Sequence, residues 1–289
     1  MKQIARLLIA YDGSPCSDAA LEDLKRAGLP KQLEAVVLTV ADLVFVPPNE
    51  QLTADEIVSP GAAVMVAGLQ HHVHEVLKQT QETAERGADH VKREFPEWTV
   101  SSRAEGDAPA WSVIKTAASL TADLIVVGAH RHSSVGGRLI MGSVSQRVLY
   151  EAGCSVRVAR CSKQQHEGPV RVVVGFDGST ESVAAIDAVI ARAWPAGSEV
   201  RVVTAGNAVA FAEQQEKLRA AGLSDSEVIR QGDPARVIIH EAEEWGADSI
   251  FLGTRNLHGL QHLLRGSVAS EVAAEAQCSV EVVRQVAPR

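Results

Sequence analysis

The sequence has little of what an extracellular or membrane-spanning protein needs. It has only four cysteines (16, 154, 161 and 278), and none forms a CxxC pair or a Cys/His spacing typical of zinc. No apolar run approaches the roughly 18 residues that cross a bilayer. The short apolar stretch near the N-terminus ends at Asp12-Gly13-Ser14 rather than in a signal-peptide cleavage site. We therefore expect reduced, mostly buried thiols, a cytoplasmic location and no membrane partner.

Aromatic residues and positive charge are scarce as well. Aromatics make up 4% of the chain, and 36 acidic residues outnumber 28 basic ones, which gives a formal net charge of −8. A chain without a basic surface field is poorly matched to nucleic acid, so no nucleic-acid partner is expected. The 46% apolar and 22% charged residues are typical of a globular protein, and 289 residues suit two α/β domains.

The chain contains two copies of one pattern. Three blocks recur in the same order, and a repeat of this kind defines the architecture. The matched blocks are residues 5–21 and 170–186, 105–130 and 231–255, and 142–160 and 266–284. This duplication predicts one domain at 1–160 and a second at 170–289, joined by a polar linker at 161–169.

Each copy alternates short β-branched apolar runs with helical patterns, which indicates parallel βαβ units. In the second copy the expected strands are residues 171–175, 199–204, 226–230, 249–253 and 279–284, and the expected helices are 181–193, 207–222, 235–246 and 268–276. The fold class is thus α/β, with a doubly wound five-stranded parallel sheet in each domain. Ligands of such sheets bind beyond the carboxyl ends of the strands.

The first copy carries an additional segment after its second strand, 35–42. Residues 45–61 are expected to form a loop and 62–94 a long helix. The loop lies near the expected ligand edge, and the sequence does not decide between a lid and a surface decoration.

Two kinds of polar motif follow the strands. Asp12 and Asp177 each end a first strand, where a carboxylate can accept hydrogen bonds from a ribose or cap the next helix. Gly128 and Gly253 end the fourth strands, where a glycine permits a close ligand approach.

A Gly-Ser pair follows each of these glycines, Gly142-Ser143 in the first copy and Gly266-Ser267 in the second. Each pair opens a helix whose N–H groups favour phosphate. The serines would add donors, or would only cap the helices.

The strand–Asp-Gly-Ser start, the Gly-Asp turn before the third helix and the Gly…Gly-Ser loop resemble the universal stress protein family over almost the whole chain. The resemblance implies a Rossmann-like sheet with strand order 3-2-1-4-5 in each domain, and a tandem member of the family. In the nucleotide-binding branch the loop reads G-x2-G-x9-G-[ST], and the nucleotide lies across the first-strand Asp, the end of the second strand and that loop.

The resemblance carries over these positions residue by residue. In the first copy they are Tyr11, Asp12, Val40, Val127, Gly128, His130, Gly142, Ser143, Val144 and Ser145. In the second they are Phe176, Asp177, Ala205, Leu252, Gly253, Arg255, Gly266, Ser267 and Val268.

The chain departs from the family pattern at the second glycine. Arg131 and Asn256 stand there, and Ala269 replaces the last loop hydroxyl of the second copy. A side chain at the second glycine either obstructs the phosphates or, for arginine, pairs with one.

The resemblance implies a stress-response regulatory protein that binds ATP, AMP or another adenine nucleotide in at least one domain, with Mg²⁺ only alongside ATP. Hydrolysis would be slow at most, because no dedicated base or metal-ligand pair is visible. It also implies unknown protein partners, an internal pseudo-dimer through the last strands, and a homodimer. The alternative is a scaffold that binds no nucleotide and acts by protein–protein contact. Among weaker candidates, His71, His72 and His74 are expected to form a surface cluster, and Cys16 is expected next to the nucleotide loop.

Overall fold

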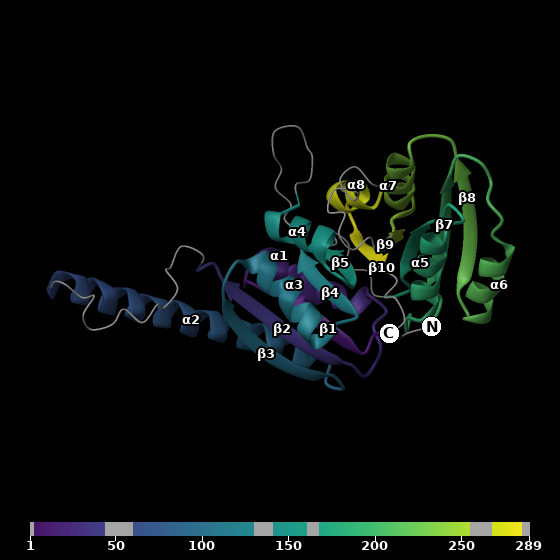
Figure 1. The fold of residues 1–289 in the computed structure, drawn as a ribbon. Coiled ribbons are helices and arrows are strands. Elements are labelled where there is room, and N and C mark those ends of the chain that lie inside the picture. Colours follow the sequence, from purple (N-terminus) through teal and green to yellow (C-terminus); the bar gives the residue numbers. More distant parts are fainter. Residues whose placement is uncertain (1–2, 44–59, 130–140, 161–167, 255–267, 285–289) are drawn as a thin grey trace.

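The structure is a computed structural model that describes residues 3–43, 60–129, 141–160, 168–254 and 268–284, and only the backbone of 60–67. Figure 1 shows two α/β parts whose strands lie side by side. We call the part up to residue 160 half one and the part from 168 half two.

Half one contains five strands and four α-helices among the described residues, together with a short 3₁₀ helix. In chain order they are β1 (Arg6–Ala10), α1 (Pro15–Asp23), the 3₁₀ helix η1 (Leu24–Arg26), β2 (Glu34–Ala41), α2 (Pro60–Glu94), β3 (Thr99–Gly106), α3 (Pro109–Leu120), β4 (Leu124–Gly128), α4 (Ser143–Glu151) and β5 (Ser155–Ala159). The long additional helix expected over 62–94 is present as α2.

Half two repeats this order. Its elements are β6 (Arg171–Gly175), α5 (Thr180–Ile190), β7 (Glu199–Ala205), α6 (Ala212–Ala220), β8 (Ser224–Arg230), α7 (Pro234–Trp245), β9 (Ser249–Thr254), α8 (Val268–Glu275) and β10 (Ser279–Arg284). The expected strands agree with these bounds to within two residues.

Helix α6 is shorter than the expected helix over 207–222. Gly206, just before the expected start of the helix, takes a φ of +101°. Phe211 then packs its ring 5.6 Å from that of Phe176, and Val209 contacts Gly178. Tertiary packing of these apolar side chains therefore delays the start of the helix to Ala212.

The strand order confirms the expected fold and extends it. Within each half the order is 3-2-1-4-5, with every pair parallel. The last strands, β5 and β10, pair antiparallel and join the two halves into one ten-stranded sheet. We call this β5–β10 junction the seam.

A buried chain of alternating charges crosses the seam. Arg157 on β5 donates two hydrogen bonds to Asp23, at 2.6 and 3.0 Å, and lies 3.5 Å from Glu281 on β10. Glu281 in turn accepts a hydrogen bond from Arg192. Ionised groups are rarely buried unless they are paired, so these four side chains tie the two halves in one relative position.

Two further arginines clamp each half to the other. Arg160 donates to the carbonyl groups of Ala273 and Ala274 at the end of α8. Arg284, at the equivalent repeat position, donates to the carbonyl groups of Leu149 and Cys154, in α4 and just beyond it. A cation at a helix C-terminus satisfies carbonyl groups that have no partner within the helix.

The helices form two layers around the sheet. One apolar core, beneath α3, α4, α7 and α8, continues across the seam through residues of β5 and β10. On the other face, α1 and α2 cover half one, whereas α5 and α6 cover half two through a separate core.

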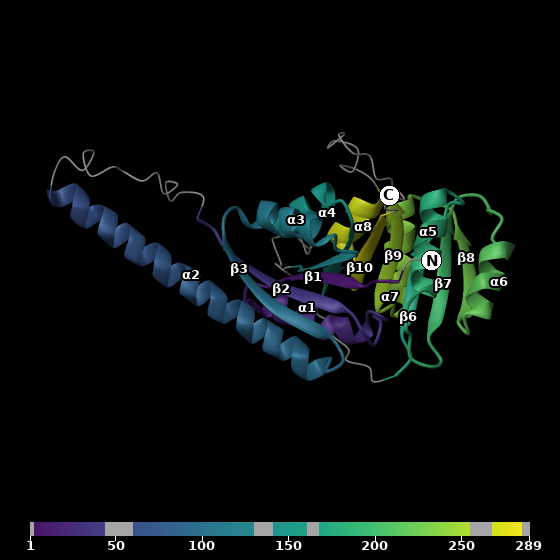
Figure 2. The ribbon, with the colours of Figure 1, turned by 60° about the horizontal axis from the view of Figure 1, so that its bottom comes forward.

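Helix α2 packs only its C-terminal part on the sheet, where Ala84, Ala88 and Val91 are buried. Figure 2 shows its N-terminal part projecting well beyond the sheet. Within the described residues, no helix combines the length and the apolar character needed to cross a membrane.

Candidate functional site

A cavity of about 280 Å³ opens at the carboxyl ends of β1, β2 and β4 in half one. Its lining comes from these strand ends and from the first turns of α1, α3 and α4. The lining residues are Ala10, Tyr11, Asp12, Ser14, Cys16, Ser17, Leu38, Val40, Pro109, Val113, Val127, Gly128, Gly142, Ser143, Val144 and Ser145. Every site residue that the resemblance implied for half one and that the structure describes is among them.

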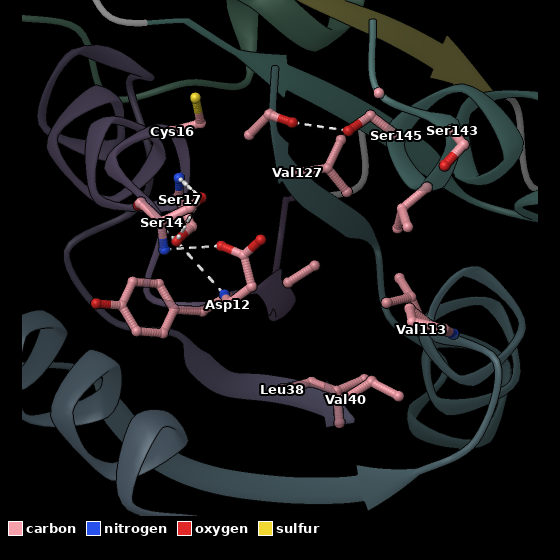
Figure 3. A pocket seen from close by; sticks show the side chains of 16 residues that line it. Asp12, Ser14, Cys16, Ser17, Leu38, Val40, Val113, Val127, Ser143 and Ser145 are labelled. Atoms are coloured by element: carbon pink, nitrogen blue, oxygen red, sulfur yellow. Dashed lines mark hydrogen bonds between the residues drawn. The ribbon is translucent and has the colours of Figure 1, made fainter. Parts of the chain in front are cut away.

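The Asp12 loop forms one rim of the cavity. Asp12 accepts the backbone N–H of Ser14 at 2.9 Å, and the Ser14 side chain accepts the N–H of Ser17 at 3.2 Å. Ser14 is therefore the N-cap of α1, and Asp12 braces the loop before it. Asp12 stays exposed, with its carboxylate pointing into the cavity (Figure 3).

Packing within the protein requires a glycine at position 128. A Cβ atom at this position would lie 2.6 Å from the carbonyl oxygen of Cys16 in the first turn of α1. Packing of β4 against α1 therefore accounts for a glycine here. Gly128 also lines the cavity, and its role as a point of close ligand approach stays a prediction.

The first turn of α4 forms the opposite rim. Its N-cap is Gly142, which has no side chain to accept a hydrogen bond, and Ser143 is the first helical residue. The alternative in which Ser143 caps the helix is thus wrong. Because the first N–H groups of a helix have no partner within it, this end presents donors and positive dipole to the cavity.

Ser145 lines the cavity, as predicted, and its hydroxyl also makes a hydrogen bond within the protein. Its hydroxyl donates to the carbonyl oxygen of Gly128 at 2.7 Å, and its side chain is buried. The bond fastens α4 to the end of β4, so Ser145 fixes the rim in position.

Apolar side chains separate the two rims. Leu38 and Val40 lie on one face of β2, and Val113 of α3 and Val127 of β4 complete the walls (Figure 3). Of these, Leu38 and Val113 were not predicted. The alternation along β2 could have identified Leu38, because residues two apart in a strand share a face. Only the packing of α3 brings in Val113. The arrangement suits a ligand with a flat apolar part, hydroxyl groups and an anionic end.

The Tyr11 side chain makes its contacts within the protein rather than with the polar groups of the cavity. Its hydroxyl donates to Asp18 at 2.7 Å, and its ring packs against Gly87 of α2. Burial, the hydrogen bond to Asp18 and that carboxylate's charge together raise the pKa of Tyr11 from 10.0 to about 12.

We expect Tyr11 to titrate about two pH units above an ordinary tyrosine. Since the folded state holds the proton more tightly, the stability from Tyr11 is complete below pH 10 and is lost as the pH rises through 12. Tyr150 is the other tyrosine of the chain. Ultraviolet absorbance of the Tyr150→Phe variant, with circular dichroism confirming the fold, isolates Tyr11. A midpoint near pH 10 in the folded protein would contradict the Asp18 contact.

In half two the described counterparts occupy equivalent positions. Asp177 accepts the backbone N–H and the hydroxyl of Ser179. Burial opposes ionisation of Asp177, but the hydrogen bonds from Ser179 and Ser182 outweigh it and hold the pKa of the carboxyl below its usual value. Phe176 and Leu252 are buried. Ala205 ends β7, Gly253 is the last residue but one of β9, and Val268 begins α8.

Several predicted site residues lie outside the described residues. They are His130, Arg131, Arg255, Asn256, Gly266 and Ser267.

In the part of the chain that the structure describes, the weaker candidate residues do not form a metal-binding cluster. His71, His72 and His74 are exposed on the projecting part of α2, and no described group of three or more His, Cys, Asp or Glu side chains is arranged to hold a metal ion. Cys16, Cys154 and Cys278 are free thiols. Cys16 alone of these three lines the cavity, as its position in the sequence suggested.

Comparison with known proteins identifies one family and relatives that match the chain over nearly its whole length. The family model described as the universal stress protein family matches residues 3–160 and 204–284. A universal stress protein of Mycolicibacterium smegmatis is 26% identical over 96% of this chain and 96% of its own length. A crystal structure of a universal stress protein from Archaeoglobus fulgidus superposes with a TM-score of 0.70, at 22% identity, over 98% of this chain and 99% of that one.

Proposed function

The chain belongs to the universal stress protein family, and from this premise we propose that it is a stress-response regulatory protein that binds ATP or another adenine nucleotide in the cavity of half one. The observation that supports the proposal is the cavity itself. It combines an exposed carboxylate, apolar walls and a helix N-terminus without a side-chain cap within about 280 Å³. Ligand sites are typically mostly apolar clefts with a few convergent polar groups.

Each part of a nucleotide has a counterpart in the lining. The walls from Leu38, Val40, Val113 and Val127 suit the flat faces of a base. The Asp12 carboxylate suits ribose hydroxyls, because it accepts hydrogen bonds and stands at the opposite rim from the helix. The first turn of α4 suits phosphate, which helix N-termini bind through N–H groups and dipole.

The lining favours binding over catalysis. Among its described residues the titratable side chains are Tyr11, Asp12 and Cys16. Tyr11 is held by Asp18, and Asp12 already accepts the Ser14 N–H. A hydrolase needs a base within reach of an attacking water, and Asp12 alone is a weak candidate. We therefore expect little or no ATP hydrolysis. Mg²⁺ enters only with the phosphates of ATP.

Calorimetric titration of the purified protein with ATP–Mg, ADP and AMP tests the proposal. We expect Asp12→Asn to weaken binding about 10-fold or more, because a charged hydrogen-bond acceptor is lost while the amide oxygen still accepts the Ser14 N–H. We expect Val127→Phe to abolish binding by filling the cavity. Asp89→Ala, which removes an exposed carboxylate from α2, is the matched control and should leave the affinity unchanged.

Failure of all three nucleotides to bind would favour the scaffold alternative. One feature of the structure supports that alternative. The described part of α2 beyond the sheet carries exposed apolar side chains, such as Leu69, which is 38% exposed, and no described residue of half two corresponds to this helix extension. The cytoplasmic location remains a prediction from the sequence, and the homodimer and the existence of protein partners remain predictions of the family resemblance.

A further inference from the structure

We infer that half one is the nucleotide-binding half and that the corresponding site of half two is closed by its own side chains, so that each chain binds one nucleotide. The inference rests on the proposed function. It follows from comparing the cavity of half one, position by position, with the same strand ends in half two.

The floor of the site differs at three equivalent positions. Ala10, Val113 and Val127 line the cavity in half one. The repeat places Gly175, Ile238 and Leu252 at these positions in half two. A Cβ atom on Gly175 would lie 2.5 Å from Leu252 Cδ2 and 2.8 Å from Ile238 Cδ1. The two larger side chains therefore meet directly above the first strand and occupy the place of the Ala10 methyl group.

The neighbouring strand changes in the opposite direction. Val203 and Ala205 on β7 are smaller than their counterparts Leu38 and Val40 on β2. In half two the larger side chains are therefore on α7 and β9 rather than on the second strand. Both of them, Ile238 and Leu252, are buried. Because protein interiors are close-packed, such a redistribution closes one part of a site even when total side-chain volume changes little.

The charge at the rim also changes. Cys16 lines the cavity from the first turn of α1, and Glu181 holds the same position in α5. Glu181 therefore adds a second carboxylate beside Asp177 and makes the site less favourable for an anionic ligand, whereas Cys16 adds none beside Asp12. Glu181 also accepts a hydrogen bond from Thr180 at 3.1 Å, which keeps its oxygen at the helix start.

The rim of half two is narrower as well. A Cβ on Gly253 would lie 1.8 Å from the carbonyl oxygen of Glu181, against 2.6 Å between a Cβ on Gly128 and the carbonyl oxygen of Cys16. The end of β9 therefore approaches the start of α5 more closely than β4 approaches α1. Ala269, moreover, lacks the hydroxyl with which Ser145 fastens α4 to β4.

Stoichiometry and a pair of matched variants test this inference on the full chain. Titration with ATP–Mg should give one equivalent per chain. Asp12→Asn should weaken binding about 10-fold or more, whereas Asp177→Asn, the same change in half two, should alter the affinity by less than twofold. Val127→Phe provides a second disruption of half one that leaves the Asp12 loop intact.

A gain of binding provides the converse test. The triple variant Glu181→Cys, Ile238→Val and Leu252→Val gives half two the residues of half one at these positions, and it should raise the stoichiometry above one. Two equivalents in the unaltered protein would overturn the inference and leave the proposed function standing. Loss of binding in Asp177→Asn but not in Asp12→Asn would place the nucleotide in half two, and would overturn both the inference and the proposed site in half one. No binding by the unaltered protein would overturn both.

Discussion

Replacement of Arg157 by Met is expected to lower the free energy of unfolding by about 3–5 kcal/mol, because it leaves Asp23 buried without its cation and Glu281 with Arg192 alone. Arg157 is fully buried, and it contacts both Asp23 and Glu281. Burial alone would lower the pKa of Arg157, but the charges of Asp23 and Glu281 outweigh it and raise that pKa, so the guanidinium stays charged. Urea unfolding at pH 7 measures the loss.

Arg147→Met is the matched control for this prediction. Arg147 pairs with Glu151 at 3.1 Å on the surface of α4, with its side chain 52% exposed. Exposed pairs of this kind contribute about 0.2–1 kcal/mol. If the two variants lose the same stability, the buried chain of charges does not hold the halves together.

The same side chains explain why half one pairs with half two. Arg157 and Glu281 occupy equivalent repeat positions, and the antiparallel register places them opposite one another. Pairing two copies of half one in this register would bury arginine against arginine, and pairing two copies of half two would bury glutamate against glutamate. Like charges directly opposite each other destabilise a strand pair, so the seam favours the pairing within one chain.

The second large effect is expected from Gly253→Ala. The added methyl group would lie 1.8 Å from the carbonyl oxygen of Glu181 and 2.1 Å from its carbonyl carbon. Both neighbours are backbone atoms, so β9 and α5 must move apart. We expect a loss at or above the upper end of the roughly 1–3 kcal/mol typical of overpacking, measured as the free energy of unfolding in urea.

Alanine substitutions at two other glycines serve as comparisons for Gly253→Ala. Gly128→Ala meets the carbonyl oxygen of Cys16 at 2.6 Å and should cost less than Gly253→Ala. Gly153 is exposed and has no neighbour within 4 Å of an added Cβ, so Gly153→Ala should change stability by less than about 0.5 kcal/mol. Equal effects at the three positions would show that the strand ends do not approach the helix starts as closely as the structure has them.

Much of the fold could be predicted because it is encoded in short windows. Apolar runs such as 171–175 and 279–284 appear as β6 and β10 with those bounds. Because the pattern is duplicated, the strand order expected for one half also predicted that of the other. The prediction was least accurate for α6, where the side chains of Val209 and Phe211 contact residues that are distant in sequence.

The candidate site was predicted in part, because motifs at strand ends are local and cavity walls are not. Asp12, Gly142 and Ser143 were recognised from the residues around them, and each lines the cavity. The packing roles of Gly128 and Ser145 were not predicted, because each depends on a contact between elements. Gly128 abuts α1, and Ser145 bonds to the end of β4.

The sequence by itself determined the repeated α/β pattern, the family and the strand ends at which a ligand can bind, since periodicity and motif spacing are properties of contiguous residues. Tertiary structure decided how the halves join, through charges 124 positions apart that face each other across the seam. It also decided how the two sites differ, because Leu252 and Ile238 come from separate elements and meet only when β9 and α7 pack over Gly175. Such convergence depends on the packing of side chains from distant segments, and no window of the sequence contains it.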